Sequence, residues 1–213
     1  NNSMPSALAH LRILDLTRVL AGPWCGQTFA DLGADVIKLE RPGSGDDTRA
    51  WGPPYLRDAD GNDTTEAAYY LAANRGKRSV TVDITTPEGQ QIIRQLAAQS
   101  DVVLENYKVG QLEKYGLDYA SLKQVKPDLI YCSITGYGQD GPYRDRAGHD
   151  LNYLSIAGMT AYNGRKQSGP APMAFQVADI AGGSCHAVMG VLAAVVHRQL
   201  TGEGQHLDIS MTD

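Results

Sequence analysis

Apolar residues gather along the chain in short runs that are bounded by turn-forming residues. Runs of this kind are typical of strands that are buried on both faces of a sheet. They predict strands at residues 11–16, 36–40, 79–83, 102–105, 129–134 and 205–210. We therefore expect one sheet to form the centre of the molecule.

Helices are expected between these runs, because the intervening segments repeat their apolar residues with a period near 3.6. They are predicted at residues 23–32, 66–73, 119–125 and 182–200, and one more begins after Thr86. That start is well marked, since Thr is a favourable N-cap and Pro87 suits the first helical position. A short helix is also expected from His149, with its apolar side at Leu151, Leu154 and Ile156.

The fold class follows from the order of these elements. Strands alternate with helices, which favours an α/β fold that is Rossmann-like, with an open, mainly parallel sheet and helices on both faces. Residues 41–62 are rich in Gly, Pro and Asp and are expected to form a loop or an exposed excursion. No Gly-x-Gly-x-x-Gly follows the first strand and no Walker loop is present. Binding of a dinucleotide or ATP by these modes is therefore disfavoured.

Two loops carry residues that suit a ligand. Residues 74–78, Asn-Arg-Gly-Lys-Arg, place three cations within four positions. They form either a solvated turn or a clamp for phosphate, and the sequence leaves this choice open. Residues 106–110 follow a predicted strand at its carboxyl end, which is where open parallel sheets bind ligands.

The segment 146–150, Arg-Ala-Gly-His-Asp, carries the candidate chemistry together with Asp179. His149 is expected to titrate near neutrality. Asp179 precedes a long apolar helix, whose dipole is expected to keep the carboxylate ionised. Two such groups suit proton transfer on opposite sides of one carbon. Structural interpretations stay open as well: His149 bonding its own loop, and Asp150 and Asp179 acting as helix caps.

Composition narrows the class of protein. The 213 residues suffice for one large domain, and 42% of them are hydrophobic. The net charge of -5 argues against general nucleic-acid binding. Cys25, Cys132 and Cys185 lack metal-ligand spacing, so no metal is expected, and buried free thiols indicate a reducing, cytoplasmic location. No apolar run reaches ~18 residues, so no membrane span is expected.

Six motifs occur in one order along the chain. They are residues 14–23 (Leu-Asp-Leu-Thr-Arg-Val-Leu-Ala-Gly-Pro), 32–40 (Leu-Gly-Ala-Asp-Val-Ile-Lys-Leu-Glu), 74–79 (Asn-Arg-Gly-Lys-Arg-Ser), 105–107 (Glu-Asn-Tyr), 136–142 (Gly-Tyr-Gly-Gln-Asp-Gly-Pro) and 201–205 (Thr-Gly-Glu-Gly-Gln). Together they resemble the class III CoA-transferase family (CaiB/BaiF-like), which also contains the α-methylacyl-CoA racemases. The resemblance covers residues 11–213.

Within this family, the residue before Asp150 distinguishes two activities. Transferases commonly carry Gly-Tyr-Asp, in which the Asp attacks an acyl-CoA thioester and forms an anhydride. This chain has Gly-His-Asp followed by Leu-Asn-Tyr, which is similar to the racemase branch. The resemblance therefore implies a racemase or epimerase of 2-methyl-branched acyl-CoA thioesters, with His149 and Asp179 transferring protons through an enolate. The alternatives are a CoA-transferase with Asp150 as nucleophile and an inactive CoA-binding fragment.

The resemblance also implies a site for coenzyme A. The matched CoA-binding positions are Arg41, Ala73, Arg75, Lys77, Asn106, Tyr107, Lys108 and Tyr137. Coenzyme A enters as part of the substrate, so no cofactor is expected. The expected partners are an acyl-CoA and a second copy in an interlocked homodimer, with no nucleic acid and no membrane.

The resemblance divides the chain as follows. Residues 1–3 are interpreted as an expression scar, and residues 4–213 as the N-terminal part of the large CoA-binding α/β domain. The small domain of the family, its returning C-terminal segment and the Glu that supports the racemase His all fall outside these residues.

Overall fold

The centre of the molecule is a six-stranded sheet in which every strand pair is parallel. The strands are β1 (Arg12–Asp15), β2 (Asp35–Glu40), β5 (Arg78–Thr81), β6 (Val102–Glu105), β7 (Ile130–Thr135) and β10 (His206–Ser210). Their order is β10-β7-β6-β1-β2-β5, so the direction of winding reverses between β1 and β6. This is the doubly wound Rossmann arrangement, and it confirms the predicted fold class.

The computed structural model describes residues 6–213. The interpretation of residues 1–3 as an expression scar therefore concerns residues outside the described part of the chain.

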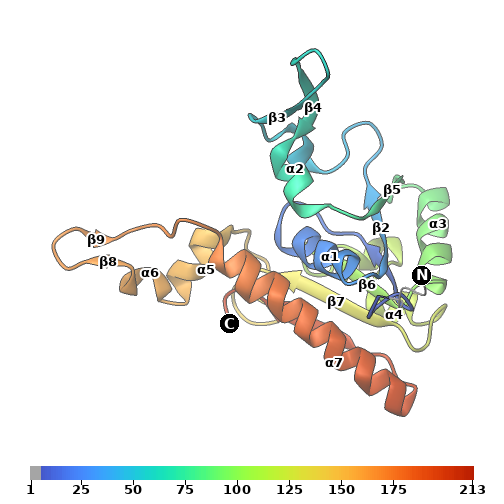
Figure 1. Ribbon diagram of the computed structural model, residues 1–213. Helices are drawn as coiled ribbons and strands as arrows, with labels where there is room; N and C mark the ends of the chain where they lie inside the picture. Colours follow the sequence, from blue (N-terminus) through green and yellow to red (C-terminus); the bar gives the residue numbers. More distant parts are fainter. Residues whose placement is uncertain (1–5) are drawn as a thin grey trace.

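Helices cover both faces of the sheet (Figure 1). Helices α1 (Ala21–Asp31) and α7 (His186–Thr201) pack on one face, while α3 (Pro87–Ala98) and α4 (Tyr119–Leu122) pack on the other. Neighbouring residues of β1 point to opposite faces, with Ile13 in the first core and Leu14 in the second. Phe29 of α1 is fully buried, which stabilises the first core by roughly 2 kcal/mol.

The ends of two helices agree with their local sequence signals. The hydroxyl oxygen of Thr86 accepts a hydrogen bond from the Gly89 N–H at 3.1 Å, and Pro87 begins α3, as predicted. Gly33 follows the end of α1 with a φ of 97°, a left-handed conformation that glycine adopts without steric cost.

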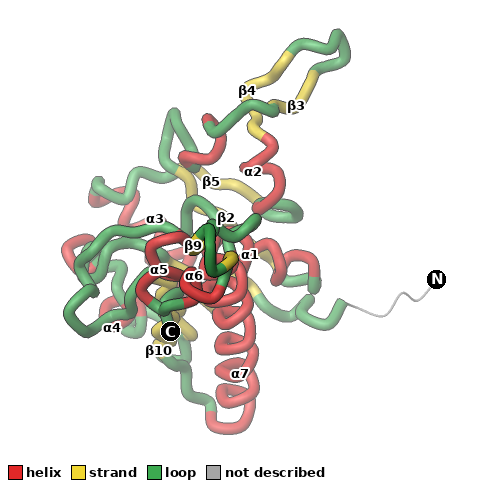
Figure 2. The backbone as a smooth tube through the Cα atoms, turned by 90° about the vertical axis from the view of Figure 1, so that its left-hand side faces the viewer, coloured by secondary structure: helices red, strands yellow, loops and turns green. Residues whose placement is uncertain are grey.

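Two hairpins project from the body of the molecule (Figures 1 and 2). The first pairs β3 (Tyr55–Arg57) with β4 (Asp63–Ala67), between the 3₁₀ turn Asp47–Ala50 and α2 (Ala68–Ala73). Residues 41–62 were expected to form a loop or an exposed excursion, and the hairpin agrees with the second alternative, although the strand β3 itself was not predicted. This strand lies on no core, so its sequence has no alternation of apolar and polar residues to mark it.

The second hairpin lies near the short helices that follow the candidate segment 146–150. It pairs β8 (Gly164–Arg165) with β9 (Gly169–Pro170), after α5 (Asp150–Ile156) and α6 (Met159–Tyr162). The predicted apolar side of α5 is correct only for Leu154, because Leu151 and Ile156 are 48% and 52% exposed.

The predicted long helix begins earlier than expected and in another geometry. A π-helix, Ala178–Cys185, runs directly into α7. It approaches its neighbours closely, since a Cβ on Gly182 would lie 2.9 Å from the Met211 carbonyl oxygen. The joint segment Ala178–Thr201 has 24 residues, and an 18-residue stretch within it has a mean hydropathy of 1.6. It is long and apolar enough to cross a membrane, contrary to our expectation, although Ala187 and Val191 belong to the core.

The cysteines of the described residues are all free. Cys25 and Cys132 are buried as expected, whereas Cys185 is exposed at the junction between the π-helix and α7.

Candidate active site

The loops after β1 and β6 meet where the sheet reverses its direction of winding. The Arg18 N–H donates to Asn106 Oδ1 at 3.0 Å, and Asn106 Nδ2 donates to the Arg18 carbonyl oxygen at 2.7 Å. Because both strands end here, this crevice is the position at which doubly wound sheets bind ligands.

A buried network of charges holds the loop after β1 in place. The carboxylate of Asp15 accepts hydrogen bonds from the N–H and hydroxyl of Thr17, and from Lys77 Nζ at 2.8 Å. Lys38 Nζ donates to the Thr17 carbonyl oxygen at 2.9 Å and to Asp46 at 2.8 Å. Burial by itself would raise the pKa of Asp15, but Lys77 and Lys38 outweigh it and keep that pKa below its usual value.

Val19 lies in this loop in a strained conformation. Its φ of 74° is in the left-handed region, which costs a β-branched residue on the order of 1–3 kcal/mol. The Val19 N–H faces the Asp46 carboxylate at 3.3 Å, and Asp46 is itself fixed by Lys38. The charge network therefore stabilises a backbone shape that the local sequence disfavours.

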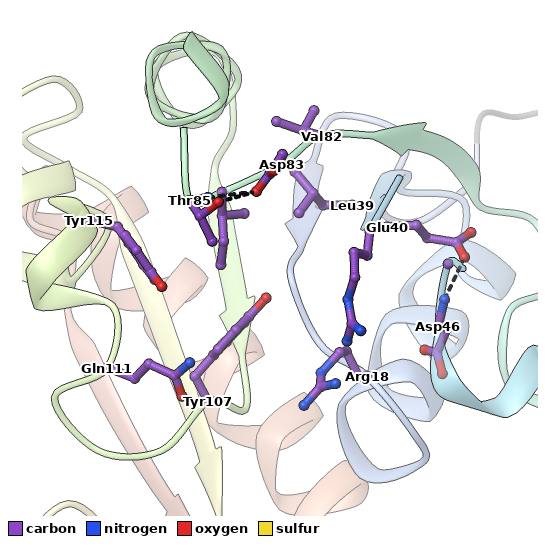
Figure 3. Close-up of a pocket in the computed structure, with 13 residues that line it drawn as sticks. Arg18, Leu39, Glu40, Asp46, Val82, Asp83, Thr85, Tyr107, Gln111 and Tyr115 are labelled. Atoms are coloured by element: carbon purple, nitrogen blue, oxygen red, sulfur yellow. Dashed lines mark hydrogen bonds between the residues drawn. The ribbon is translucent and has the colours of Figure 1, made fainter. Parts of the chain in front are cut away.

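A cavity of about 220 Å³ opens beside this loop (Figure 3). Arg18 and Tyr107 point into it from opposite sides, with Gln111 and Tyr115 farther along its wall. Arg41 also lines it and is 3.7 Å from Asp47. Aromatic rings beside arginine side chains suit a ligand that combines an aromatic base with phosphate groups.

A second cavity, of about 280 Å³, adjoins the first and shares Arg18 and Tyr107 with it. It brings together Asp179, His149 and the loops after β1, β6 and β7. The predicted residues that line it are Asn106, Tyr107, Lys108, Tyr137, His149 and Asp179.

Asp179 lies in the first turn of the π-helix and lines the second cavity, and no side chain caps this helix from the N-cap position. Burial and the neighbouring charge of Asp150 raise the pKa of Asp179 to about 6. Its pKa is thus raised rather than lowered, although a carboxyl group with a pKa of about 6 is still mostly ionised at neutral pH, the state that we expected. No cation among residues 6–213 forms an ion pair with Asp179.

Asp150 has a different position, although it was considered with Asp179 for the chemistry. Asp150 Oδ1 accepts a hydrogen bond from the backbone N–H of Asp179 at 2.9 Å. Asp150 is not among the residues that line the second cavity. Its carboxylate therefore fixes the start of the π-helix and, through it, the position of Asp179.

His149 is the N-cap residue of α5, and its exposed side chain lines the second cavity. Its backbone N–H donates to Asn152 Oδ1 at 2.9 Å. The preceding Gly148 lies against Tyr153, whose hydroxyl donates to the Gly148 carbonyl oxygen. A Cβ on Gly148 would lie 2.7 Å from the Tyr153 ring, so this close approach requires glycine.

The other predicted CoA-binding residues lie outside these two cavities. Ala73 is fully buried at the end of α2. Arg75 pairs with Asp31 on the surface. Lys77 is 2% exposed and donates to Asp15, to the Pro23 carbonyl oxygen and to Asn74. An ammonium group has three donors, so Lys77 has none left for a phosphate.

Sequence reasoning gave no individual role to four further residues that line the second cavity, although Arg18 and Arg146 belong to motifs that it quoted. The four are Arg18, Arg144, Arg146 and Tyr153. Arg18 follows β1 directly, and the other three come after β7. The rule that ligands bind at the carboxyl ends of parallel strands was the available signal, and it applies to every loop at this edge.

Comparison with known proteins places the chain in a family. Residues 8–213 match the family described as CoA-transferase family III. A CAIB/BAIF family protein from Brucella suis has the same fold, with a TM-score of 0.93 and 48% identity over 99% of this chain and 54% of that one. Rv3272 from M. tuberculosis gives a TM-score of 0.87 with 38% identity, over 98% of this chain and 56% of that one. The chain belongs to CoA-transferase family III.

Two of its relatives are named as transferases. The chain is 51% identical to a succinate–glutarate CoA-transferase of Agrobacterium fabrum, over 97% of this chain and 51% of that protein. It is 44% identical to the human succinyl-CoA:glutarate CoA-transferase, over 99% of this chain and 46% of that protein. The chain thus spans about half the length of these relatives. They support the transferase alternative better than the racemase interpretation.

Proposed function

We propose that the complete protein transfers coenzyme A between carboxylic acids, with dicarboxylic acids such as succinate and glutarate as the exchanging pair. The observation that carries this proposal is the carboxylate of Asp179, which faces a cavity without a cationic partner among the described residues. The names of relatives with 51% and 44% identity support the class of acid.

Asp179 is well suited to covalent catalysis. Its carboxylate oxygen attacks the carbonyl carbon of the acyl-CoA, a C–O bond forms, the C–S bond breaks, and the CoA thiolate leaves an acyl–aspartyl anhydride. The thiolate then attacks the aspartyl carbonyl, which gives an aspartyl thioester and releases the first acid. The second acid repeats these steps in reverse order, and Asp179 regains its carboxylate.

We favour Asp179 over Asp150 as the nucleophile because of their different surroundings. Asp179 lines the cavity, whereas an oxygen of Asp150 is engaged by the Asp179 N–H. A pKa of about 6 leaves Asp179 ionised at neutral pH and more nucleophilic than an ordinary aspartate. We expect the transfer rate to fall as the pH drops through about 6, because the carboxylate becomes protonated.

Isotope transfer tests the assignment in the complete protein. During turnover with succinyl-CoA and glutarate labelled with ¹⁸O in its carboxylates, the anhydride leaves one labelled oxygen on the nucleophile. Trypsin separates Asp150 from Asp179 at Arg165 and Lys166, so mass spectrometry assigns the label. We expect it on Asp179, and we expect Asp179→Asn to lower the rate at least ~10⁴-fold. Label on Asp150 alone would show that Asp150 is the nucleophile.

The racemase hypothesis keeps one observation in its favour, since His149 and Asp179 line the same cavity. A racemase exchanges the α-proton of a 2-methylacyl-CoA in deuterium oxide without any acceptor acid. Exchange that requires His149 and proceeds faster than CoA transfer would support this second function.

Assembly and binding by this chain alone are separate proposals. Large apolar side chains are exposed on α5, α6 and the following loop, including Ile156, Tyr162 and Phe175. They suit the expected homodimer, which light scattering of the complete protein tests.

Calorimetric titration of residues 1–213 with coenzyme A, beside an assay of turnover, tests whether this chain binds without catalysis.

A further inference from the structure

The second cavity contains cations that the steps above do not use. Lys108, Arg144 and Arg146 line it together with Asp179. None of the three forms an ion pair with that carboxylate within the described residues. An acid and several cations that share a cavity without pairing leave room for a ligand that contacts both.

Of the two arginines in this group, Arg146 is the one without a carboxylate partner among the described residues. Its guanidinium carbon lies 5.1 Å from the centre of the Tyr143 ring, and it pairs with no carboxylate among residues 6–213. Arg144 has such a partner, since its Nε lies 3.6 Å from Asp145. Lys108 belongs to the segment of Asn106 and Tyr107, on the side where the two cavities join.

Arg146 also belongs to the part of the chain that positions Asp179. It is four residues before Asp150, whose carboxylate holds the backbone N–H of Asp179 at 2.9 Å. The loop between them carries Gly148 and His149, which line the same cavity. The chain between Arg146 and Asp150 is therefore short, and Asp150 in turn holds the backbone of Asp179, the residue that we assign as the nucleophile.

We propose that Arg146 is a specificity-determining residue that binds the second carboxylate of a dicarboxylic acyl group while Asp179 attacks its thioester, an inference that rests on the proposed function. Guanidinium and carboxylate are matched in shape and form two parallel hydrogen bonds. The adjoining first cavity, with Arg18 and Arg41, is left for the phosphates of coenzyme A.

This arrangement selects against monocarboxylic acyl groups. A butyryl chain has the same number of carbons as a succinyl chain, but it places a methyl group where the guanidinium requires an acceptor. A site that binds a carboxylate through a charged hydrogen bond rejects an analogue without that carboxylate. The guanidinium of the site would then be left without its acceptor.

The test compares two donors in the complete protein. The kcat/KM for CoA transfer to glutarate is measured with succinyl-CoA and with butyryl-CoA, for the wild type and for Arg146→Met. We expect the substitution to lower the ratio of succinyl-CoA to butyryl-CoA by ~10–100-fold, the effect of one charged hydrogen bond. Arg146→Lys should restore part of this ratio.

Arg144→Met is the matched control, because Arg144 lines the same cavity but faces Asp145. It should leave the ratio as in the wild type. Equal losses with both donors in Arg146→Met would overturn the inference and assign Arg146 to the phosphates of coenzyme A. An unchanged ratio would overturn it as well. If the wild type transfers CoA from neither donor, the proposed function itself fails, and the two failures are thus distinguished.

Discussion

Asp15 and Asp179 are both withdrawn from water, yet their surroundings differ. Asp15 is completely buried and accepts hydrogen bonds from Thr17 and Lys77, with Lys38 nearby. Its pKa lies below the usual value, because the two lysines outweigh the effect of burial. Asp179 faces a cavity and has another acid, Asp150, as its charged neighbour, so its pKa is raised to about 6.

The difference separates a structural charge from one available for chemistry. At Asp15 every partner comes from within the chain, and the result is a rigid loop after β1. At Asp179 the charge has no internal counter-ion among the described residues, so a substrate or a covalent intermediate can relieve it. Perturbed carboxylates of the second kind are typical of functional sites.

Removal of Lys77 should produce the largest change in stability. Lys77→Met leaves Asp15 buried without its closest cation, and the loss of one partner of a buried pair costs about 3–5 kcal/mol. Chemical denaturation at pH 7 measures this loss. The difference in free energy of unfolding between Lys77→Met and the wild type should shrink as the pH falls towards the usual pKa of a carboxyl group. A protonated Asp15 needs no cation.

The control for Lys77→Met is the double variant with Asp15→Asn. An Asn oxygen can still accept from the Thr17 N–H, so removing both charges should recover most of the lost stability. If Lys77 binds a CoA phosphate instead, Lys77→Met weakens CoA binding while stability changes little. That result would reverse the assignment of Lys77 as a structural residue.

This example also shows how far the sequence could lead. The sequence pattern predicted all six strands of the central sheet. It is clearest for the inner strands β6 and β7, which are buried on both faces and need continuous apolar residues. The strands of the hairpin β3–β4 were not predicted, because Ala67 is their only buried residue. The motif that contains Lys77 marks the residue but not its partner, since Asp15 is 62 positions away and only the folded sheet brings them together.

The candidate site was predicted in part for the same reason. His149 and Asp179 are far apart in sequence, yet they line one cavity. The separate positions of Asp150 and Asp179 depend on one long-range hydrogen bond that no local pattern encodes. The π-helix depends on contacts of Gly182 with Met211, which are equally non-local.

Neutralising Asp179 should change the stability of the protein by an intermediate amount. Unlike Lys77→Met, it should raise the stability. The pKa of Asp179 is about 6 in the folded chain against an ordinary value of 3.8. Between these values the folded state binds more protons than the unfolded state, so stability falls as the pH rises and the full penalty applies above pH 6. Asp179→Asn should therefore stabilise the protein by about 1–3 kcal/mol at pH 8.

The pH dependence provides the control for Asp179→Asn. Denaturant midpoints of the variant and the wild type should converge below about pH 3, where Asp179 is protonated in both the folded and the unfolded state. A variant that is less stable than the wild type at pH 8 would show that Asp179 has a stabilising partner, and the contrast with Asp15 would disappear.

The smallest effect is expected at Arg75, whose pair with Asp31 is formed in solvent. Both side chains are well exposed, 63% for Arg75 and 41% for Asp31, so water and salt screen their attraction. Arg75→Ala should leave the midpoint of thermal unfolding unchanged within experimental error, and any remaining difference should vanish in high salt.

Calorimetric titration with coenzyme A provides a second measurement on Arg75→Ala, because the family resemblance predicts Arg75 as a CoA ligand. We expect its affinity to stay at the wild-type value, since Arg75 lines neither cavity. Loss of a phosphate contact would instead weaken binding ~10-fold or more, and would show that Arg75 leaves Asp31 when the ligand binds.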